Sequence, residues 1–239
     1  MTSPTPPFSP RIREPGKPFV VAIDGPAASG KSSTAQWVAN ELGFLHIDSG
    51  SLYRAATAAA LEAAPDAAPD AAPTEDAVLR AAKAITLAPA GRSLVPMREG
   101  RSMEEALRGS GVTQRVSEVA RMPRVRAWVN ARVRDAAAQR DVVVDGRDIG
   151  TAVFPEAGAK IYLVADPWER ARRRLIQRLD RAPHDPEIAE ETERLVARDA
   201  RDAAQSAPAA RAMLIDTTYL TQEEQVSRIV AFARAVHGR

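Results

Sequence analysis

The sequence predicts an α/β fold in which a parallel sheet carries helices on both faces. Short apolar, β-branched runs occur at residues 19–23, 142–144 and 161–164, and each stops at a polar or glycine turn. Segments with helical spacing of apolar residues separate these runs. Strands that alternate with helices form parallel sheets, because each crossover helix returns the chain to the same edge. With 239 residues, the chain is long enough to bury one sizeable core.

The first elements follow from simple periodicities. Residues 19–23 form a continuous apolar run, as expected of a strand that is buried on both faces. After a glycine-rich stretch, apolar residues recur with the spacing of a helix that Gly43 ends; they are Ala35, Val38, Ala39 and Leu42. Residues 44–47 predict a second strand, and an alanine-rich helix follows from about residue 52.

The pattern changes between residues 84 and 103. The runs 85–87 and 94–97, with turns at Gly91 and Gly100, predict a small antiparallel hairpin inserted into the α/β order. Before it, residues 64–75 repeat a short Ala-Pro-Asp theme that predicts a low-complexity loop. After it, a basic helical region extends to residue 140.

The C-terminal half returns to strands and helices in alternation. An arginine-rich helix is predicted after the strand at 161–164 and continues to about residue 181. A further helix near 188–198 and a strand at 213–215 follow. Thr221 and Glu224 have the spacing of a capping box, which predicts the start of a final helix.

The composition disfavours several classes of protein. Lys and Arg number 33 against 31 Asp and Glu, and only 5% of residues are aromatic, which argues against nucleic-acid binding. There is no cysteine for disulfides or thiolate metal sites. The apolar runs are too short to span a bilayer. Residues 1–18 are rich in proline and lack the apolar segment of a signal peptide, so we expect a disordered tail and a cytoplasmic protein.

The strongest chemical signal is the run 25–32, which fits the P-loop pattern G-x-x-x-x-G-K-[ST]. A strand before it and a helix after it are the required context, so a chance match is disfavoured. Backbone N–H groups of such a loop, together with the helix N-terminus, bind phosphate. Lys31 would reach the β- and γ-phosphates, and the Ser32 hydroxyl would bind Mg²⁺. The predicted nucleotide-binding residues are Gly25, Pro26, Ala27, Ala28, Ser29, Gly30, Lys31, Ser32 and Ser33.

A second group of polar residues follows the strand at 142–144. Asp145 stands where a Walker-B carboxylate would hold Mg²⁺ or its water. On local grounds, a plain strand-ending turn explains Asp145 and Gly146 equally well. Arg147 and Asp148 come next, at the edge where open α/β sheets bind ligands. A guanidinium beside a carboxylate suits a ligand that carries both a phosphate and a base.

Five blocks, in order, resemble bacterial cytidylate kinase, and the likeness extends from about residue 19 to the C-terminus. They are residues 24–32, 48–54 (Asp-Ser-Gly-Ser-Leu-Tyr-Arg), 123–126 (Pro-Arg-Val-Arg), 145–151 (Asp-Gly-Arg-Asp-Ile-Gly-Thr) and 198–202 (Arg-Asp-Ala-Arg-Asp). The resemblance implies a three-layer P-loop nucleoside monophosphate kinase domain at residues 19–239. Its hairpin-bearing nucleoside monophosphate (NMP) binding insert would span about 63–122, and its helical lid about 170–208.

The resemblance also implies residue roles. Ser49 and Ser117 would contact the nucleoside, and Arg126 and Asp148 would read the base. The acceptor phosphate would be bound by Arg54, Arg147 and Arg198, and the ribose hydroxyls by Asp202. Arg108 matches a family arginine just after the insert and is included among the substrate-binding residues. Lys31, Arg147 and Arg198 would be catalytic, and Ser32 and Asp145 would hold the metal. Arg170 and Arg174 are lid candidates over ATP, although surface arginines explain them as well.

The chemistry of cytosine agrees with these roles. Asp148 can accept from the exocyclic amino group, and Arg126 can donate to N3 and O2. Uracil reverses the donor–acceptor pattern and would leave buried groups unpaired. The expected reaction is ATP + CMP → ADP + CDP, with dCMP also accepted and Mg²⁺ as cofactor. The acceptor phosphate is already ionised, so alignment and charge compensation suffice.

One departure and several alternatives remain. The family usually has an arginine where this chain has Gln205; Arg201 or Arg211 could compensate, or lid closure could be weaker. The acceptor could instead be UMP, AMP or a metabolite hydroxyl. A P-loop switch is disfavoured because no Asn-Lys-x-Asp guanine-reading motif occurs. We expect a monomer that binds ATP and CMP or dCMP, without nucleic-acid or membrane partners.

Overall fold

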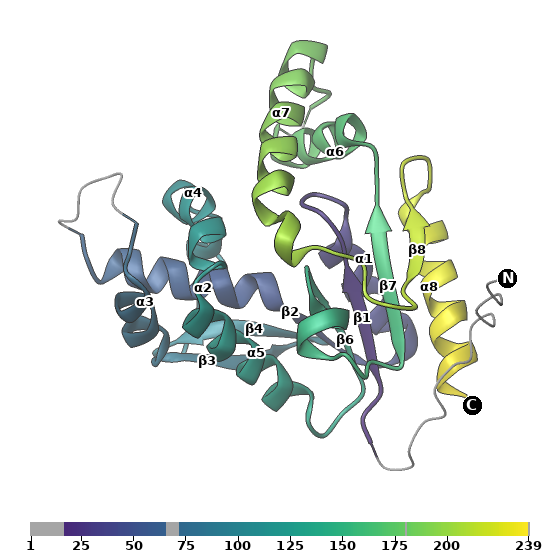
Figure 1. The fold of residues 1–239 in the computed structure, drawn as a ribbon, viewed down its shortest axis with the longest axis horizontal. Helices are drawn as coiled ribbons and strands as arrows, with labels where there is room; N and C mark the ends of the chain where they lie inside the picture. Colours follow the sequence, from purple (N-terminus) through teal and green to yellow (C-terminus); the bar gives the residue numbers. More distant parts are fainter. Residues whose placement is uncertain (1–16, 66–71, 180, 239) are drawn as a thin grey trace, which may run out of the picture.

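A single sheet lies at the centre of the structure, a computed structural model that describes residues 17–65, 72–179 and 181–238 (Figure 1). The strand order is β3-β4-β2-β6-β1-β7-β8, and β5 pairs with β4. The prediction of an α/β fold with helices on both faces of a parallel sheet is confirmed. The tail expected at residues 1–18 lies outside the described residues, apart from Lys17 and Pro18, as does part of the loop expected at 64–75.

The parallel strands place three carboxylates at one edge. These strands are β1 (Val20–Asp24), β2 (Leu45–Asp48), β6 (Val142–Gly146), β7 (Ala159–Val164) and β8 (Met213–Asp216). Asp48 pairs with Asp145 in the register of β2 and β6, and Asp24 lies beside Gly146. Because the carboxyl ends of parallel strands meet at one edge, these side chains gather where a ligand would bind.

The predicted antiparallel hairpin forms, but it belongs to the central sheet. It consists of β3 (Ile85–Ala90) and β4 (Ser93–Arg98), with the short β5 (Arg101–Ser102) beside β4. β4 also pairs in parallel with β2, where His46 lies opposite Ser93. The outer edge of β2 needs partners for its backbone groups, and β4 supplies them.

Helices cover the sheet in two sets (Figure 1). One set is α2 (Ser49–Glu62), α3 (Glu75–Ala82), α4 (Ser110–Val119) and α5 (Pro123–Ala137), and the other is α1 (Lys31–Leu42) and α8 (Gln222–His237). Alternate residues of β1 enter two different cores: Val20 and Ala22 pack with the first set, and Val21 and Ile23 with the second. This alternation is the period of two that a strand imposes on its side chains.

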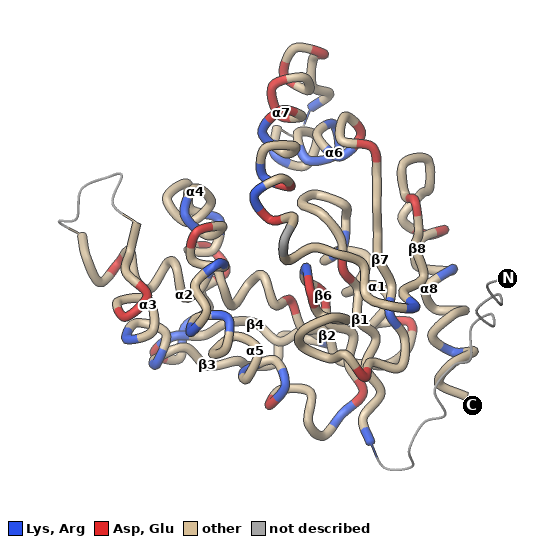
Figure 2. The backbone as a smooth tube through the Cα atoms, viewed as in Figure 1, with Lys and Arg blue, Asp and Glu red and all other residues tan. Residues whose placement is uncertain are grey.

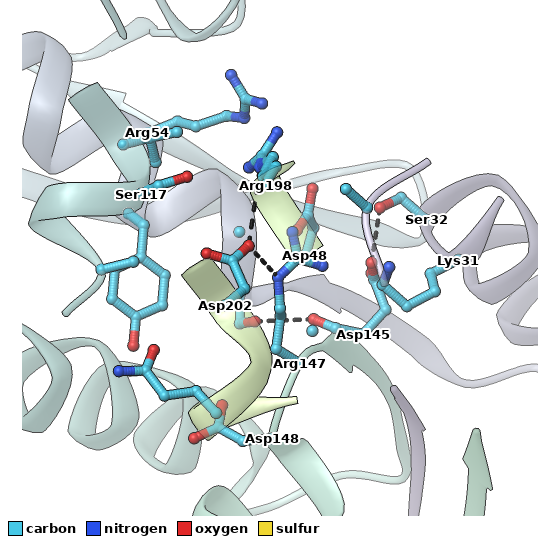
Figure 3. Close-up of a pocket in the computed structure, with 18 of the residues that line it drawn as sticks. Lys31, Ser32, Asp48, Arg54, Ser117, Asp145, Arg147, Asp148, Arg198 and Asp202 are labelled. Atoms are coloured by element: carbon cyan, nitrogen blue, oxygen red, sulfur yellow. Dashed lines mark hydrogen bonds and ion pairs between the residues drawn. The ribbon is translucent and has the colours of Figure 1, made fainter. Parts of the chain in front are cut away.

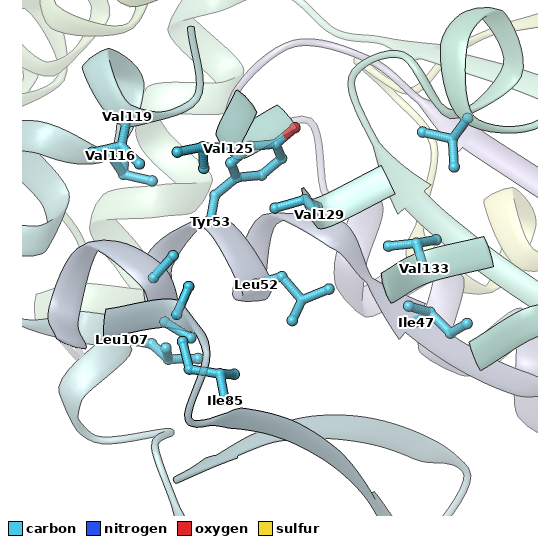
Figure 4. Packing of buried hydrophobic residues seen from close by; sticks show 14 of the residues in the cluster. Ile47, Leu52, Tyr53, Ile85, Leu107, Val116, Val119, Val125, Val129 and Val133 are labelled. Atoms are coloured by element: carbon cyan, nitrogen blue, oxygen red, sulfur yellow. The ribbon is translucent and has the colours of Figure 1, made fainter. Parts of the chain in front are cut away.

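The larger core lies around α2 (Figure 4). Leu52 and Tyr53 pack among apolar side chains of α4 and α5, which are Val116, Val119, Val125, Val129 and Val133. Tyr53 is thereby held with its ring in the core, one residue before Arg54 on the same helix. The core therefore fixes the helix that follows the carboxyl end of β2.

Two helices, α6 (Pro167–Leu179) and α7 (Asp185–Asp202), project beyond the sheet edge and pack on each other (Figure 1). α7 is longer at both ends than the predicted 188–198. It begins early because the backbone N–H of His184 donates to Glu187 (2.8 Å), a carboxylate that Arg181 also binds. Acidic and basic residues mix along both helices (Figure 2).

Short helical turns join these elements near the sheet edge: η1 (Ala106–Arg108), η2 (Ile149–Val153) and η3 (Ala203–Gln205). The capping box predicted at Thr221 and Glu224 forms at the start of α8. Among the described residues, no helix has both the length and the apolar character that crossing a bilayer requires.

Candidate active site

The loop between β1 and α1 closes tightly on its own lysine. Gly25 has a φ of 152°, and a Cβ there would come within 2.3 Å of the Leu163 carbonyl oxygen, so only glycine fits. Lys31 donates to the Pro26 carbonyl (2.5 Å) and to the Ser29 hydroxyl (3.3 Å). Burial, assisted by the positive charge of Arg147, lowers the Lys31 pKa to about 7. An anion bound beside this buried ammonium would favour its charged form.

Beneath Lys31, a hydroxyl and a carboxylate meet at the N-terminus of α1. Ser32 donates to one oxygen of Asp145 (2.6 Å), and the His46 Nε2 lies 2.7 Å from the other. Hydroxyl and carboxylate oxygens are suitable Mg²⁺ ligands. The described residues contain no cluster of three His, Cys, Asp or Glu side chains that could hold a metal. The donor set therefore fits a cation that takes its other ligands from phosphates and water.

Two more groups at this edge are strongly perturbed. Burial and then the charge of Asp145 raise the pKa of Asp48 to about 6, and its side chain accepts from the Ser51 N–H (3.1 Å) to cap α2. Burial, the largest single influence, would lower the pKa of His46, but the hydrogen bond and charge of Asp145 and the charge of Asp48 together raise it. Burial thus makes this edge costly for unpaired charge.

Most of the predicted site residues line one pocket (Figure 3). They are Ala27, Ala28, Lys31, Ser32, Ser49, Arg54, Ser117, Arg126, Asp145, Arg147, Asp148, Arg198 and Asp202. A second pocket shares Ala28, Lys31 and Ser32 with the first and adds Ser29, Gly30 and Ser33. Arg108 is exposed on η1 and lines neither pocket; the carbonyl of its neighbour Leu107 accepts from Arg54 (3.2 Å).

At one end of the first pocket, Arg126 is bound from two sides. Its guanidinium donates to Asp148 and, at 3.0 Å, to the side-chain oxygen of Gln205. Burial raises the pKa of Asp148 despite the opposing charge of Arg126. The neighbouring Tyr53 hydroxyl is buried without a hydrogen-bond partner among the described residues. These groups can recognise a flat ligand that presents both donors and acceptors.

Towards the middle of the pocket, arginines crowd around one carboxylate. Arg147 donates to Asp202 (2.9 Å), and the Arg198 Nε lies 3.7 Å from the same carboxylate without forming a hydrogen bond. Burial, followed by the charge of Arg147, lowers the Arg198 pKa to about 10. Burial also lowers the pKa of Arg54. Three arginines, two of them sharing one carboxylate, suit an anionic ligand.

The two lid candidates have different surroundings. Arg174 lines both pockets and pairs with the buried Glu191 of α7 (2.8 Å). Arg170 is only 4% exposed, so the alternative of a solvated surface arginine does not hold for it. It donates to the Ala27 carbonyl (2.8 Å) and to Asp199 (2.7 Å), so it fastens α6 and α7 to the P-loop.

One face of α7 and η3 contacts the whole length of the site. Asp199 accepts from the Ala27 N–H (3.2 Å), Asp202 binds Arg147, and Gln205 binds Arg126. Residues three apart lie on neighbouring turns of a helix. Arg201 and Arg211, the suggested substitutes for the missing family arginine, are exposed and line neither pocket.

Sequence reasoning missed several supporting residues. Asp24 accepts from the backbone N–H groups of Ile149 and Gly150, each at 2.8 Å, and so fastens the loop that carries Arg147 and Asp148. Burial raises the pKa of Asp24 to about 6. His46 and Tyr53 were not predicted either, because cross-strand contacts and orphaned hydroxyls are invisible in the sequence. The signals for Asp24 were its place at the end of a buried strand and its position in the first block of the family resemblance.

Fold and site together define a P-loop phosphotransferase, in which two pockets meet at Lys31 and Ser32. A family model described as cytidylate kinase matches residues 21–235. Curated cytidylate kinases are similar over most of their length. The protein from Thermus thermophilus is 44% identical over 216 residues, covering 90% of this chain and 98% of the relative. The protein from Deinococcus radiodurans is 44% identical over 219 residues, covering 89% and 98%.

The chain belongs to the cytidylate kinase family, and the resemblance seen in its motifs is confirmed. A cytidylate kinase from Limosilactobacillus fermentum is also 39% identical over 217 residues, covering 89% of this chain and 94% of the relative. Among solved structures, a gluconokinase from Sinorhizobium meliloti is similar with a TM-score of 0.45 and 15% identity, covering 94% and 97%.

Proposed function

We propose that this protein transfers the γ-phosphoryl group of ATP to CMP and dCMP, giving CDP and dCDP for pyrimidine nucleotide metabolism. The observation that carries the proposal is the pairing of Asp148 with Arg126 at the far end of a pocket that is otherwise rich in arginine. Membership in the cytidylate kinase family supports the same reaction.

The first pocket would hold the acceptor nucleotide. Its base would lie at Asp148 and Arg126, with Ser117 and the Tyr53 hydroxyl nearby. Asp148 would accept from the cytosine amino group, and Arg126 would donate to O2 and N3. The unpartnered Tyr53 hydroxyl supports a polar ligand here, because buried hydroxyls normally find hydrogen-bond partners. Uracil would set a carbonyl against the Asp148 carboxylate, which leaves both groups without a donor.

The acceptor phosphate would lie among the arginines at the centre of the pocket. Arg54, Arg147 and Arg198 would bind it, while Asp202 and Ser49 would contact the sugar side. The phosphate oxygen that attacks is already ionised near neutral pH, so no general base is needed. The arginines would offset the repulsion between two polyanions and hold them in line.

The second pocket would hold ATP. Its triphosphate would lie along the P-loop amides and Lys31, and its base between α6 and the loop that begins α8, where Gln177, Leu220 and Gln225 line the pocket. Ser32 and Asp145 would hold Mg²⁺, which supplies charge neutralisation on the β- and γ-phosphates. Arg174, which lines both pockets, would face the transferred group from the lid.

The domain assignments made from the sequence remain part of this proposal. The NMP-binding insert would be residues 63–122, and the lid residues 170–208 would close over ATP and exclude water. We also propose a cytoplasmic monomer without nucleic-acid or membrane partners. The formal net charge of only +2 supports the absence of nucleic-acid partners.

A panel of acceptors tests the proposal. CMP, dCMP, UMP, AMP and shikimate-like hydroxyl acceptors would be compared at equal concentration in an assay that couples ADP release to NADH oxidation. We expect the highest kcat/KM for CMP, with dCMP next. A higher kcat/KM for UMP than for CMP would mean that the base-reading roles of Asp148 and Arg126 are wrong. Activity on hydroxyl acceptors alone would overturn the proposed class of acceptor.

A further inference from the structure

The buried His46 has no part in the reaction described so far. Its side chain comes from β2 and is bonded at both ring nitrogens: Nε2 lies 2.7 Å from Asp145 Oδ1, and Nδ1 lies 3.2 Å from the Ser93 hydroxyl of β4. His46 is 6% exposed and Asp145 only 2%. A buried imidazole with two defined partners is held in one orientation, because turning the ring would break both bonds.

The contacts of Asp145 divide between its two oxygens. Oδ1 faces His46, and Oδ2 accepts from the hydroxyl of Ser32 (2.6 Å). A continuous polar chain therefore runs from Ser93 on β4 through His46 on β2 and Asp145 on β6 to the start of α1. These two contacts together restrict the rotation of the carboxylate and keep Oδ2 directed towards the P-loop serine.

The hydrogen-bond directions along this chain are consistent. Gln36 donates to the Ser93 oxygen (3.3 Å), so the Ser93 hydroxyl hydrogen is available for His46 Nδ1. Nε2 carries the hydrogen that Asp145 accepts, because a carboxylate has none to donate, and in the neutral ring Nδ1 accepts from Ser93. The sheet register places His46 directly opposite Ser93, so the hairpin edge supplies the outer support.

We propose that His46 is a positioning residue for the divalent cation that accompanies ATP. Its Nε2–H holds the Asp145 carboxylate in the orientation that the cation, or a water bound to it, requires. This inference rests on the proposed function only in taking Ser32 and Asp145 as the metal pair. Residues that support metal ligands in this way typically contribute 10–100-fold to metal affinity.

Two amide variants of equal polarity test the proposal. In H46Q the side-chain N–H can occupy the place of Nε2, whereas in H46N the shorter side chain reaches only the place of Nδ1. Binding of Mn²⁺ to the enzyme with a non-hydrolysable ATP analogue would be followed by electron paramagnetic resonance, which requires no turnover. We expect H46N to weaken Mn²⁺ binding about tenfold and H46Q to stay within about threefold of the wild type.

The Mg²⁺ concentration for half-maximal turnover should shift in the same order. V133A is the control, because Val133 is fully buried on α5 in the core and its truncation lowers stability without touching the polar chain. V133A should lower the melting temperature and leave Mn²⁺ affinity unchanged. Equal Mn²⁺ affinity for H46N and H46Q, whether normal or reduced, would overturn the proposal.

The outcome is separable from that of the proposed function. Mn²⁺ binding with the ATP analogue does not depend on the acceptor. If H46N loses affinity while the wild type phosphorylates no cytosine nucleotide, the acceptor assignment fails and the positioning role stands. If CMP turnover is normal and both variants bind Mn²⁺ like the wild type, the positioning role fails and the acceptor assignment stands.

Should H46N not fold, S93A takes its place. Loss of the Ser93 hydroxyl removes the outer support of His46 and should weaken Mn²⁺ binding relative to H46Q, and unchanged binding would overturn the proposal.

Discussion

The P-loop and the base end of the first pocket are built in opposite ways. The P-loop is one run of neighbouring residues, and it presents mainly backbone amides to a ligand. The base end is assembled from Arg126 on α5, Asp148 after β6 and Gln205 on η3, which are far apart in the chain. Phosphate binding, which many proteins need, thus depends on local backbone geometry. The proposed choice of base would depend on side chains that only the complete fold brings together.

The largest effect on turnover is expected for Lys31, the P-loop side chain that would contact the transferred phosphate. We expect K31A to lower kcat by about a thousandfold, because it removes the P-loop cation that would offset the charge developing on the transferred group. The thermal unfolding midpoint should not fall, since burial already lowers the pKa of Lys31 and so disfavours its charge. K83A, at an exposed lysine, is the control and should retain full activity. An active K31A would contradict the donor-site assignment.

The next effect concerns Asp24, which lies between the two regions and binds the loop of Arg147 and Asp148. Its pKa of about 6 exceeds the ordinary 3.8, so the folded protein retains a proton between about pH 4 and 6 that the unfolded chain has lost. Raising the pH through this window therefore lowers the free energy of unfolding, by up to about 3 kcal/mol from this group.

Substitution D24N should remove that decline. Denaturant unfolding measured at intervals from pH 4 to 7 would show a flatter profile for D24N than for the wild type. D24N should also weaken the hold on the loop at pH 7, because an amide has one acceptor oxygen for the two backbone N–H groups of Ile149 and Gly150. A slope identical to that of the wild type would mean that Asp24 does not titrate in this range.

A smaller effect should separate the two regions directly. We expect D148N to reduce kcat/KM for CMP by about tenfold to a hundredfold, the range of a lost bidentate base contact, with little change in the KM for ATP. D76N removes the partner of Arg124 in an exposed ion pair, so it is the matched control and should change neither the kcat/KM for CMP nor the KM for ATP. Equal losses for CMP, UMP and ATP would place Asp148 outside the base pocket.

The smallest effect is expected at Gln205. Q205A removes one hydrogen bond from Arg126, which corresponds to about 1 kcal/mol and a rise of about fivefold in the KM for CMP. kcat should change less, because Gln205 touches neither phosphate-binding arginine. R201A tests the suggested substitute and should change neither constant, since Arg201 is exposed and lines neither pocket. A larger effect of R201A than of Q205A would reverse these assignments.

The same difference between the two regions explains what sequence reasoning could reach. The P-loop, its strand and its helix were predictable because their signals are contiguous and periodic. The resemblance also named Arg126 and Asp148, which do meet in the structure. It did not indicate that Arg126 binds Gln205, since that contact depends on where α7 ends relative to α5. His46 was equally hidden, because its partners are set by the pairing of β2 with β4 and β6.

The hairpin illustrates the limit in another way. Its antiparallel pairing was predictable from the apolar runs and the glycine turns, but its attachment to β2 was not.

Arg170 looked like one of several arginines on a charged helix, and only packing distinguishes it from Arg172 or Arg174. Burial against Ala27 and Asp199 is a property of two elements meeting, and no pattern within α6 indicates it.

The shared face of α7 and η3 has a consequence for how the two nucleotides influence each other. Asp199, Asp202 and Gln205 connect one helix end to the P-loop, to Arg147 and to Arg126. We expect a ligand that orders any one of these three partners to restrict the others as well. Each substrate should then lower the entropic cost of binding the other, and thermodynamic linkage requires this effect to be equal in both directions.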